Sequence, residues 1–154
     1  MQRRSFEDMN CSVAQCLEVV GEWWSMLIVR DAFLGVRRFD DFQARLGISR
    51  NILNQRLTTL VDHGVLERVP YQDNPPRSEY RLTDKGLDLY PVLLAMSAWG
   101  DRYAAPADGP PITWVHRGCG AELTQEVECA DGHRLTATRE ISGRPGPGAR
   151  RRTA

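Results

Sequence analysis

Five polar side chains between residues 50 and 58 have the types and spacing that could contact the edges of DNA bases. At about 100° per residue they share one side of a helix, and they are Arg50, Asn51, Asn54, Gln55 and Thr58. Asn and Gln can pair bidentately with adenine, Arg can pair with guanine, and Thr can touch a methyl group or a phosphate. Residues 47–61 contain no carboxylate, whereas a solvated helix usually mixes acids with bases. Taken alone, the pattern fits both DNA recognition and a plain polar surface.

A second set of residues could bind a metal ion. His116, Cys119, Cys129 and His133 have the spacing H-x2-C-x9-C-x3-H within strand-like sequence. Two ligand pairs on hairpin turns can close a tetrahedral zinc site. The alternative is a small metal-free β-hairpin, because Gly132 stands where the last pair could have a second cysteine. A catalytic zinc site is not expected, since no motif such as H-E-x-x-H accompanies these residues.

Cys11 could be a reactive thiol. It immediately precedes a helix that we expect from Ser12 to about Val20. A thiol at a helix N-terminus is the better nucleophile, because that end of the helix favours the thiolate. Cys16 lies about 140° further round the helix, and we expect it to behave as an inert small hydrophobe. Cys11 is therefore a candidate redox-sensing residue, and the alternative is a quiet structural thiol.

The polar side chains need a helix that holds them on one face. Ser49 is a good N-cap and Gly64 is a residue type that ends helices, so we expect a helix over 49–63. Its buried stripe comprises Leu53, Leu57, Leu60 and Val61. A short helix over 37–47 precedes it, and Gly47 closes the turn between them. Two short helices in this order predict a helix-turn-helix arrangement.

The hydrophobic period changes from 3.6 to 2 after this helix. Residues 65–69 and 78–82 alternate apolar and polar side chains, which predicts an antiparallel hairpin. The stretch between them is rich in proline and is expected to be a loop. Arg77 at this tip is a candidate phosphate contact, whereas Arg68 and Arg81 are more typical of ordinary surface charge.

Two apolar helices are expected to build the core and a subunit interface. The helix over 22–34 carries large apolar groups, and its core candidates are Trp23 or Trp24, Leu27, Ile28 and Phe33. A long helix over 83–103, capped by Thr83, is apolar around most of its circumference, and Pro91 should kink or loosen it. Such a helix must be covered on most sides. We expect a second copy of the chain to cover it, and the alternative is that the C-terminal region folds back over it.

Composition limits what the rest of the chain can do. At 154 residues the chain can bury one core and a small appendage. Its 20 acidic and 20 basic residues cancel, so any DNA contact must come from a local patch. The sequence has no N-terminal signal-like run and no stretch of ~20 apolar residues, so a cytoplasmic protein is expected. No nucleophile–base constellation or phosphate loop indicates an enzyme.

Several segments resemble one family of regulators. These are Cys11 before a helix, G-E-W-W-S-M-L-I-V-R-D, R-R-F-D-D-F, I-S-R-N-I-L-N-Q-R-L-T-T-L-V-D-H-G-V-L-E-R, P-P-R-S-E-Y-R-L-T-D-K-G and P-V-L-L-A-M-S-A-W-G. In this order, residues 11 to about 105 resemble the HxlR-type winged helix-turn-helix regulators, which are related to the MarR group. The resemblance implies a homodimeric bacterial transcription regulator that binds double-stranded DNA at a pseudo-palindromic operator. It also implies a sensing role for Cys11, because some family members respond to electrophiles or oxidants through an N-terminal cysteine.

The expected fold is therefore mainly α with a small β wing, a winged helix-turn-helix followed by a small β-rich appendage. The expected parts are a DNA-binding and dimerisation domain over 1–105, a linker over 106–111, a hairpin or zinc-ribbon-like appendage over 112–142 and a disordered basic tail over 143–154.

The favoured function is sequence-specific DNA binding by a homodimer, acting as a repressor. The candidate DNA-contacting residues are Ser49, Arg50, Asn51, Asn54, Gln55, Thr58 and Arg77. The alternative is a ligand- or redox-responsive interaction module that has lost specific DNA binding. Zinc is a possible cofactor. A small-molecule effector could bind in a cavity lined by Trp23, Trp24 and Trp99, although such residues are more often plain core.

Overall fold

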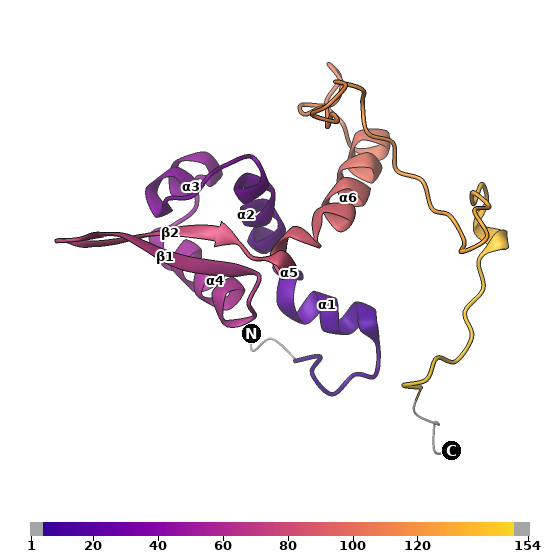
Figure 1. Cartoon of the computed structure of the whole chain (residues 1–154), viewed down its shortest axis with the longest axis horizontal. Helices are drawn as coiled ribbons and strands as arrows, with labels where there is room; N and C mark the ends of the chain where they lie inside the picture. Colours follow the sequence, from indigo (N-terminus) through magenta and orange to yellow (C-terminus); the bar gives the residue numbers. More distant parts are fainter. Residues whose placement is uncertain (1–4, 150–154) are drawn as a thin grey trace. The chain divides into compact units, whose positions relative to one another are not determined.

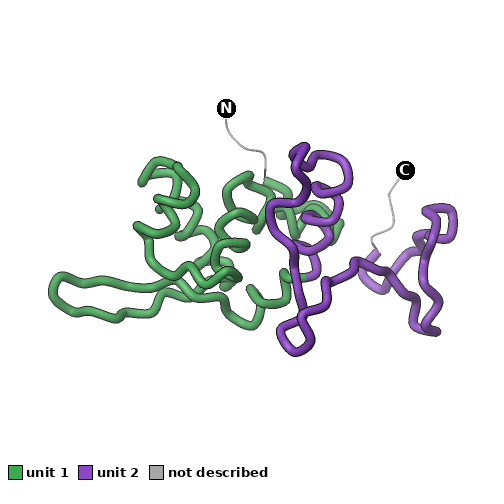
Figure 2. The backbone as a smooth tube through the Cα atoms, turned by 90° about the horizontal axis from the view of Figure 1, so that it is seen from above, with its two compact units in different colours: residues 1–90 green, residues 91–154 purple. Residues whose placement is uncertain are grey.

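The computed structural model describes residues 5–149. The chain divides into two compact units between Tyr90 and Pro91 (Figure 2). We call residues 1–90 unit 1 and residues 91–154 unit 2. This division separates the last α-helix from the helix-turn-helix elements, whereas the domain prediction grouped them together. The division into a domain over 1–105, a linker and an appendage remains a prediction.

The described part of unit 1 contains four helices, a hairpin and a short fifth helix in this order, as expected for a winged helix-turn-helix. The elements are α1 (Ser12–Val20), α2 (Trp23–Phe33), α3 (Phe39–Leu46), α4 (Arg50–Asp62), β1 (Leu66–Asp73), β2 (Pro76–Leu82) and the short α5 (Asp84–Leu87). The helix α2 lies centrally and contacts α1, α3 and α4 (Figure 1). Its sequence is rich in large apolar groups, and Ile28 and Val29 are fully buried. Trp24 is half-buried, but Trp23 is 87% exposed and is not a core residue of the single chain.

The helix α4 begins and ends where its sequence predicts. The Ser49 hydroxyl accepts a hydrogen bond from the Ile52 N–H at 3.3 Å. Gly47 (φ +65°) and Gly64 (φ +68°) adopt the left-handed conformation that lets the chain turn sharply before and after α4. The apolar stripe faces the core, with Leu53, Leu57 and Leu60 buried. The opposite face is thereby turned to solvent.

The wing is longer than predicted. Strands β1 and β2 pair antiparallel from Leu66↔Leu82 to Asp73↔Pro76, with an irregularity between Pro70 and Gln72. The proline-rich stretch was expected to be a loop, but most of it continues the ladder, because prolines are tolerated at strand ends and on exposed edges. Arg77 accordingly lies within β2, opposite Gln72, rather than in a loop.

The segment before α3 pairs with β2 and so adds a short third strand-like segment to the wing. The Tyr80 N–H donates to the Arg37 carbonyl at 2.8 Å, and Arg38 and Glu79 form an isolated antiparallel bridge. The hairpin is therefore tied to the loop between α2 and α3.

The expected long helix over 83–103 is in fact two helices, α5 and α6 (Tyr90–Tyr103). Thr83 caps α5, its hydroxyl accepting from the Gly86 N–H at 3.1 Å. The break falls just before Pro91, because proline has no N–H to donate and its ring clashes with the carbonyl four residues earlier.

The N-terminal segment folds back on α1. The Gln15 side-chain amide donates to the Met9 carbonyl at 2.9 Å, and the Glu18 carboxylate accepts from the Phe6 N–H at 2.8 Å. The last residues of the predicted basic tail, 150–154, lie outside the described residues. Within 5–149, no helix is both long enough and apolar enough to cross a membrane.

Unit 2 continues from α6 into two small hairpins. They are marked by the isolated bridges Val115↔Glu122 and Glu128↔Arg134, and a short 3-10 turn, η1 (Thr138–Glu140), follows. Hydrogen bonds from the Thr136 backbone and hydroxyl lower the pKa of the Glu140 carboxyl below its ordinary value.

Candidate nucleic-acid interface

The predicted DNA-contacting face of α4 is exposed. All six candidate residues from α4 and its cap are classed as exposed: Ser49, Arg50, Asn51, Asn54, Gln55 and Thr58. Arg56, which has the same charge as Arg50, points the other way. Its guanidinium lies 3.1 Å from Glu22 and is only 18% exposed. Arg56 is therefore a structural residue on the inner face of α4, whereas the candidate DNA-contacting residues lie on its solvent-exposed outer face.

A surface hollow lies between α4 and the wing, and we call it the α4–wing hollow. Its lining includes Arg38, Asp40, Asp41, Arg50, Asn51, Asn54, Arg68, Tyr71 and Arg77. The fold thus brings Arg77 to the same surface as the first turn and a half of α4, although more than twenty residues separate them in sequence. Gln55 and Thr58 lie outside the lining, further along the exposed face of α4.

Arg50 already has partners on α3. Its Nη1 lies 3.0 Å from Asp40 Oδ1 and 3.2 Å from Gln43 Oε1, and its guanidinium stacks 4.7 Å above the Phe39 ring. Both charged side chains are well exposed, Arg50 at 67% and Asp40 at 78%. Exposed ion pairs contribute little free energy, so a base or phosphate could replace Asp40 as the partner of Arg50.

Two residues of this surface were missed by the sequence interpretation. The Arg38 guanidinium stacks over the Tyr71 ring at 4.9 Å, and both residues line the α4–wing hollow. Tandem arginines before α3 were a possible signal, but they have different roles. Arg37 donates to the Ala32 and Val36 carbonyls at 2.6 and 2.9 Å and so secures the loop. Arg38 remains exposed at 58%.

A buried ion pair orients α3 beneath this surface. Asp31 of α2 is fully buried, and its carboxylate lies 2.8 Å from Arg30 Nη2 and 3.4 Å from Arg45 Nε of α3. The carboxylate therefore joins two helices of the helix-turn-helix unit. Neither Asp31 nor Arg45 was among the predicted functional residues, and their role here is structural.

Cys11 is the N-cap residue of α1 and is exposed. Cys16 lies within α1 and is half-buried. The Cys11 thiol therefore lies at the N-terminal end of α1, whereas the Cys16 thiol is partly covered by the protein.

The predicted metal ligands form two separate pairs. His116 Nδ1 lies 3.2 Å from Cys119 Sγ in the first hairpin, and Cys129 Sγ lies 3.4 Å from His133 Nδ1 in the second. The group whose ligand atoms all lie within 4.8 Å comprises Cys129, Asp131 and His133. Asp131 was missed in the sequence because an acidic residue in an exposed turn is common.

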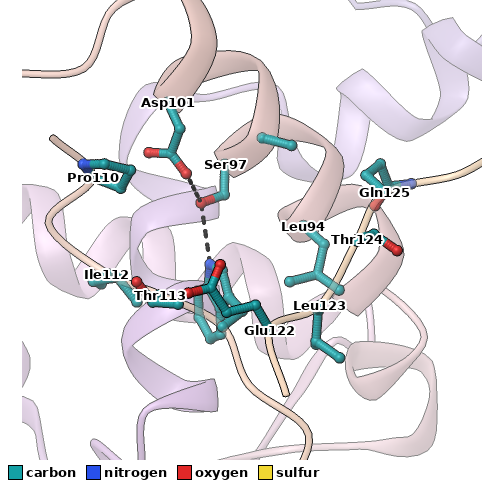
Figure 3. Close-up of a pocket in the computed structure, with 12 residues that line it drawn as sticks. Leu94, Ser97, Asp101, Pro110, Ile112, Thr113, Glu122, Leu123, Thr124 and Gln125 are labelled. Atoms are coloured by element: carbon teal, nitrogen blue, oxygen red, sulfur yellow. Dashed lines mark hydrogen bonds between the residues drawn. The ribbon is translucent and has the colours of Figure 1, made fainter.

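Unit 2 also has a small hollow beside α6. The Ser97 hydroxyl donates to the Asp101 carboxylate at 3.5 Å (Figure 3). The same hydroxyl accepts a hydrogen bond from the Trp114 indole N–H at 3.1 Å. The volume of this hollow is about 120 Å³, which is well below the ~300–1,000 Å³ of sites for drug-sized ligands. Of the tryptophans expected to line an effector cavity, Trp23 is 87% exposed and Trp99 is 65% exposed.

Comparison with known proteins identifies relatives along most of the chain. The HxlR-like helix-turn-helix family matches residues 19–108. The chain is 44% identical over 144 residues to Rv3095 of Mycobacterium tuberculosis, an uncharacterised HTH-type transcriptional regulator, and the match covers 93% of this chain and 90% of that protein.

Solved structures are similar in both sequence and fold. PA1607, a candidate transcription factor, superimposes with a TM-score of 0.82 at 43% identity over 92% of this chain and 100% of that chain. The redox regulator HypR in its oxidised form superimposes with a TM-score of 0.57 at 31% identity, over 62% of this chain and 100% of that chain. These proteins are regulators of transcription rather than enzymes, and they share the winged-helix fold.

Proposed function

This chain belongs to the HxlR-like helix-turn-helix family and is a helix-turn-helix transcriptional regulator, and from this premise we propose that it binds a specific operator as a homodimer. The site of action is the cytoplasm, where bacterial DNA lies. The observation that carries the proposal is the α4–wing hollow, in which the exposed polar end of α4 and the wing arginine Arg77 share one surface.

The helix α4 supplies the base contacts. Its exposed face presents Arg50, Asn51, Asn54, Gln55 and Thr58, and the buried leucines behind it hold that face rigidly. Amide and guanidinium groups match the donor and acceptor pattern of bases in the major groove. The Ser49 hydroxyl caps the helix end that would face a phosphate, so its contact with DNA would be at the backbone.

The wing supplies backbone contacts. Arg77 and Arg68 line the α4–wing hollow beside α4, and Arg38 lies there as well. Phosphate contacts fix the orientation of a protein on the duplex but carry no sequence information directly. We therefore assign Arg77 to positioning and Arg50 to base recognition.

Exposed apolar side chains support a homodimer. On α6 the large exposed groups are Tyr90, Val92, Met96, Trp99 and Tyr103. On α1, Val13 is 68% exposed and Leu17 is 44% exposed. Exposed apolar groups of this size on a helix mark interaction sites, and a second copy is the occupant that the family implies. Two-fold symmetry would place two α4 helices in successive major grooves, at half-sites ~10 bp apart centre to centre.

The position of one cysteine supports control by an oxidant or electrophile. Cys11 is exposed at the N-cap of α1, where a dissolved oxidant or electrophile can reach its sulfur. HypR, which has 31% sequence identity to this chain, is a redox regulator. We propose that modification of Cys11 weakens operator binding and so relieves repression.

The decisive test is fluorescence anisotropy of the purified protein with DNA from upstream of its own gene, beside a scrambled duplex, at two salt concentrations. A preference of ~1,000-fold or more for the native fragment would support the proposal. Equal and salt-sensitive binding to both duplexes, repeated across a genomic fragment library, would overturn sequence-specific recognition. Such a result would favour the interaction-module alternative.

A further inference from the structure

The two hairpins of unit 2 share several features. Each places one cysteine and one histidine at its turn, just beyond an isolated antiparallel bridge. Each turn also contains a glycine in the left-handed region, Gly120 at φ +75° and Gly132 at φ +80°. The turns are closed by backbone hydrogen bonds from Gly120 to His116 at 2.7 Å and from Gly132 to Cys129 at 2.9 Å. Each turn therefore carries one sulfur and one imidazole ligand, although their order is reversed, His116 before Cys119 and Cys129 before His133.

The ligand atoms in each turn have the separation that zinc requires. Zn–S and Zn–N bonds of ~2.3 and ~2.0 Å at a tetrahedral angle imply an S···N distance of about 3.5 Å. The observed Nδ1···Sγ distances are 3.2 Å in the first hairpin and 3.4 Å in the second. Each hairpin thus presents a nearly preformed edge of a zinc tetrahedron.

Neither hairpin encloses an apolar core of its own, although Trp114 at the base of the first contacts α6. Every residue from 115 to 134 is classed as exposed. The larger apolar side chains of this region are exposed too, with Val115 at 48%, Leu123 at 45% and Val127 at 55%. Segments of this size usually need a metal ion or a disulfide for stability, and all four thiols are free. A bound metal would supply the missing stabilisation.

We propose that His116, Cys119, Cys129 and His133 together bind one structural Zn²⁺ per chain. Cys₂His₂ is a standard closed ligand set for structural zinc. Both cysteines would bind as thiolates, so loading releases their protons, and both imidazoles would bind neutral. This site lies wholly within unit 2 and is independent of the proposed DNA-binding function.

Zinc must draw the two hairpins together. The close group in the structure is Cys129, Asp131 and His133, and the pair in the first hairpin stands apart from it. Residues 124–126 lie between the hydrogen-bonded ends of the two hairpins and belong to no helix or strand, so the required bend would fall there. We assign the remaining two positions to His116 and Cys119 rather than to Asp131 and water. Three protein ligands with one open position are typical of catalytic zinc, whereas structural sites are closed.

The test is the zinc content of the full-length protein after growth with zinc and dialysis against metal-free buffer. We expect one zinc per chain by elemental analysis. Replacing zinc with Co²⁺ should give the visible absorption of a tetrahedral thiolate site. Cys119→Ser and Cys129→Ser should each lose most of the metal. The control variants Cys16→Ser and Asp131→Asn should keep it, since neither residue is a ligand in this assignment.

Two results would overturn the site. One is wild-type protein without stoichiometric zinc that also fails to bind Co²⁺ after chelator treatment and reloading. The other is retention of metal by Cys119→Ser or its loss from Asp131→Asn, which would transfer the site to the second hairpin alone. Circular dichroism and DNA binding of each variant would show whether unit 1 is folded. Zinc content does not depend on operator binding, so the two proposals can fail separately.

Discussion

Arg50, the first residue of α4, is held by Asp40 of α3 through a 3.0 Å contact between Nη1 and Oδ1. The same guanidinium stacks on Phe39, which immediately precedes Asp40. The proposed base-contacting arginine is therefore positioned by the first helix of the helix-turn-helix pair and partly neutralised by it. Binding to DNA would exchange Asp40 for a base or a phosphate, and Asp40 then opposes binding twice, by holding Arg50 and by repelling phosphates.

Replacing Asp40 with asparagine should tighten operator binding. The broken pair is exposed, and such pairs are worth about 0.2–1 kcal/mol, so we expect up to about a 5-fold lower Kd in fluorescence anisotropy. Asp41→Asn removes the same charge from the same hollow without releasing Arg50 and serves as the matched control. Equal gains for both variants would mean that general repulsion acts alone and that the Arg50–Asp40 pair is irrelevant to binding.

Arg50 and Arg77 should differ in how their loss affects DNA binding. Arg50→Ala should cost about 1–3 kcal/mol on the operator and relax discrimination among sequences, because it removes a base contact. Arg77→Ala should weaken binding to operator and random DNA alike and reduce the salt slope by about 1, because it removes a phosphate contact. Titrations of both duplexes at several salt concentrations check this. A purely non-specific loss for Arg50→Ala would reassign it to the backbone.

The helix-turn-helix could be predicted because local rules and tertiary packing agree there. Ser49 caps α4, Gly47 and Gly64 flank it, and the leucine stripe gives the buried face. The wing was harder to predict, since its outer part is rich in proline and polar residues, and only strand pairing shows that Arg77 lies in β2.

Contacts between distant segments could not be derived from spacing. Nothing in the sequence pairs Arg38 with Tyr71, because the two residues meet only after the α2–α3 loop joins the wing. Trp23 was a core candidate on hydrophobicity, yet it is 87% exposed in the single chain. Hydrophobicity identifies surfaces that need cover but does not say whether the same chain or a partner covers them.

Removing Arg30 should destabilise unit 1 more than removing Arg45. Asp31 is fully buried, and Arg30 is its closer partner, at 2.8 Å against 3.4 Å for Arg45. Arg30→Ala would leave a buried carboxylate poorly compensated, which costs about 1–3 kcal/mol. Arg45→Ala should cost less, because its side chain is half exposed. Urea unfolding gives both values. The reverse order would mean that Arg45 carries the main compensation.

Cys11→Ser should abolish the response to oxidants. Treating the wild-type protein with diamide or a quinone should lower operator affinity about 5- to 150-fold, the usual range of coupling between two sites. With an added small thiol, diamide would oxidise Cys11 to a mixed disulfide and be reduced to its hydrazine, and the Cys11 sulfur would add to the ring of a quinone. Cys16→Ser is the matched control, since that thiol is half-buried in the same helix. An unchanged response in Cys11→Ser would end the sensing proposal.

Met96→Glu should convert the proposed dimer to a monomer. Met96 is 52% exposed on α6, among the apolar groups that we assign to the subunit interface. Burying an unpaired carboxylate there would cost several kcal/mol, and a monomer would contact only one half-site, so operator affinity should fall as well. Val127→Glu puts the same charge on an exposed apolar residue of the appendage and should leave the dimer intact. Sedimentation velocity over a range of concentrations measures both. A folded Met96→Glu variant that stays dimeric would place the interface elsewhere.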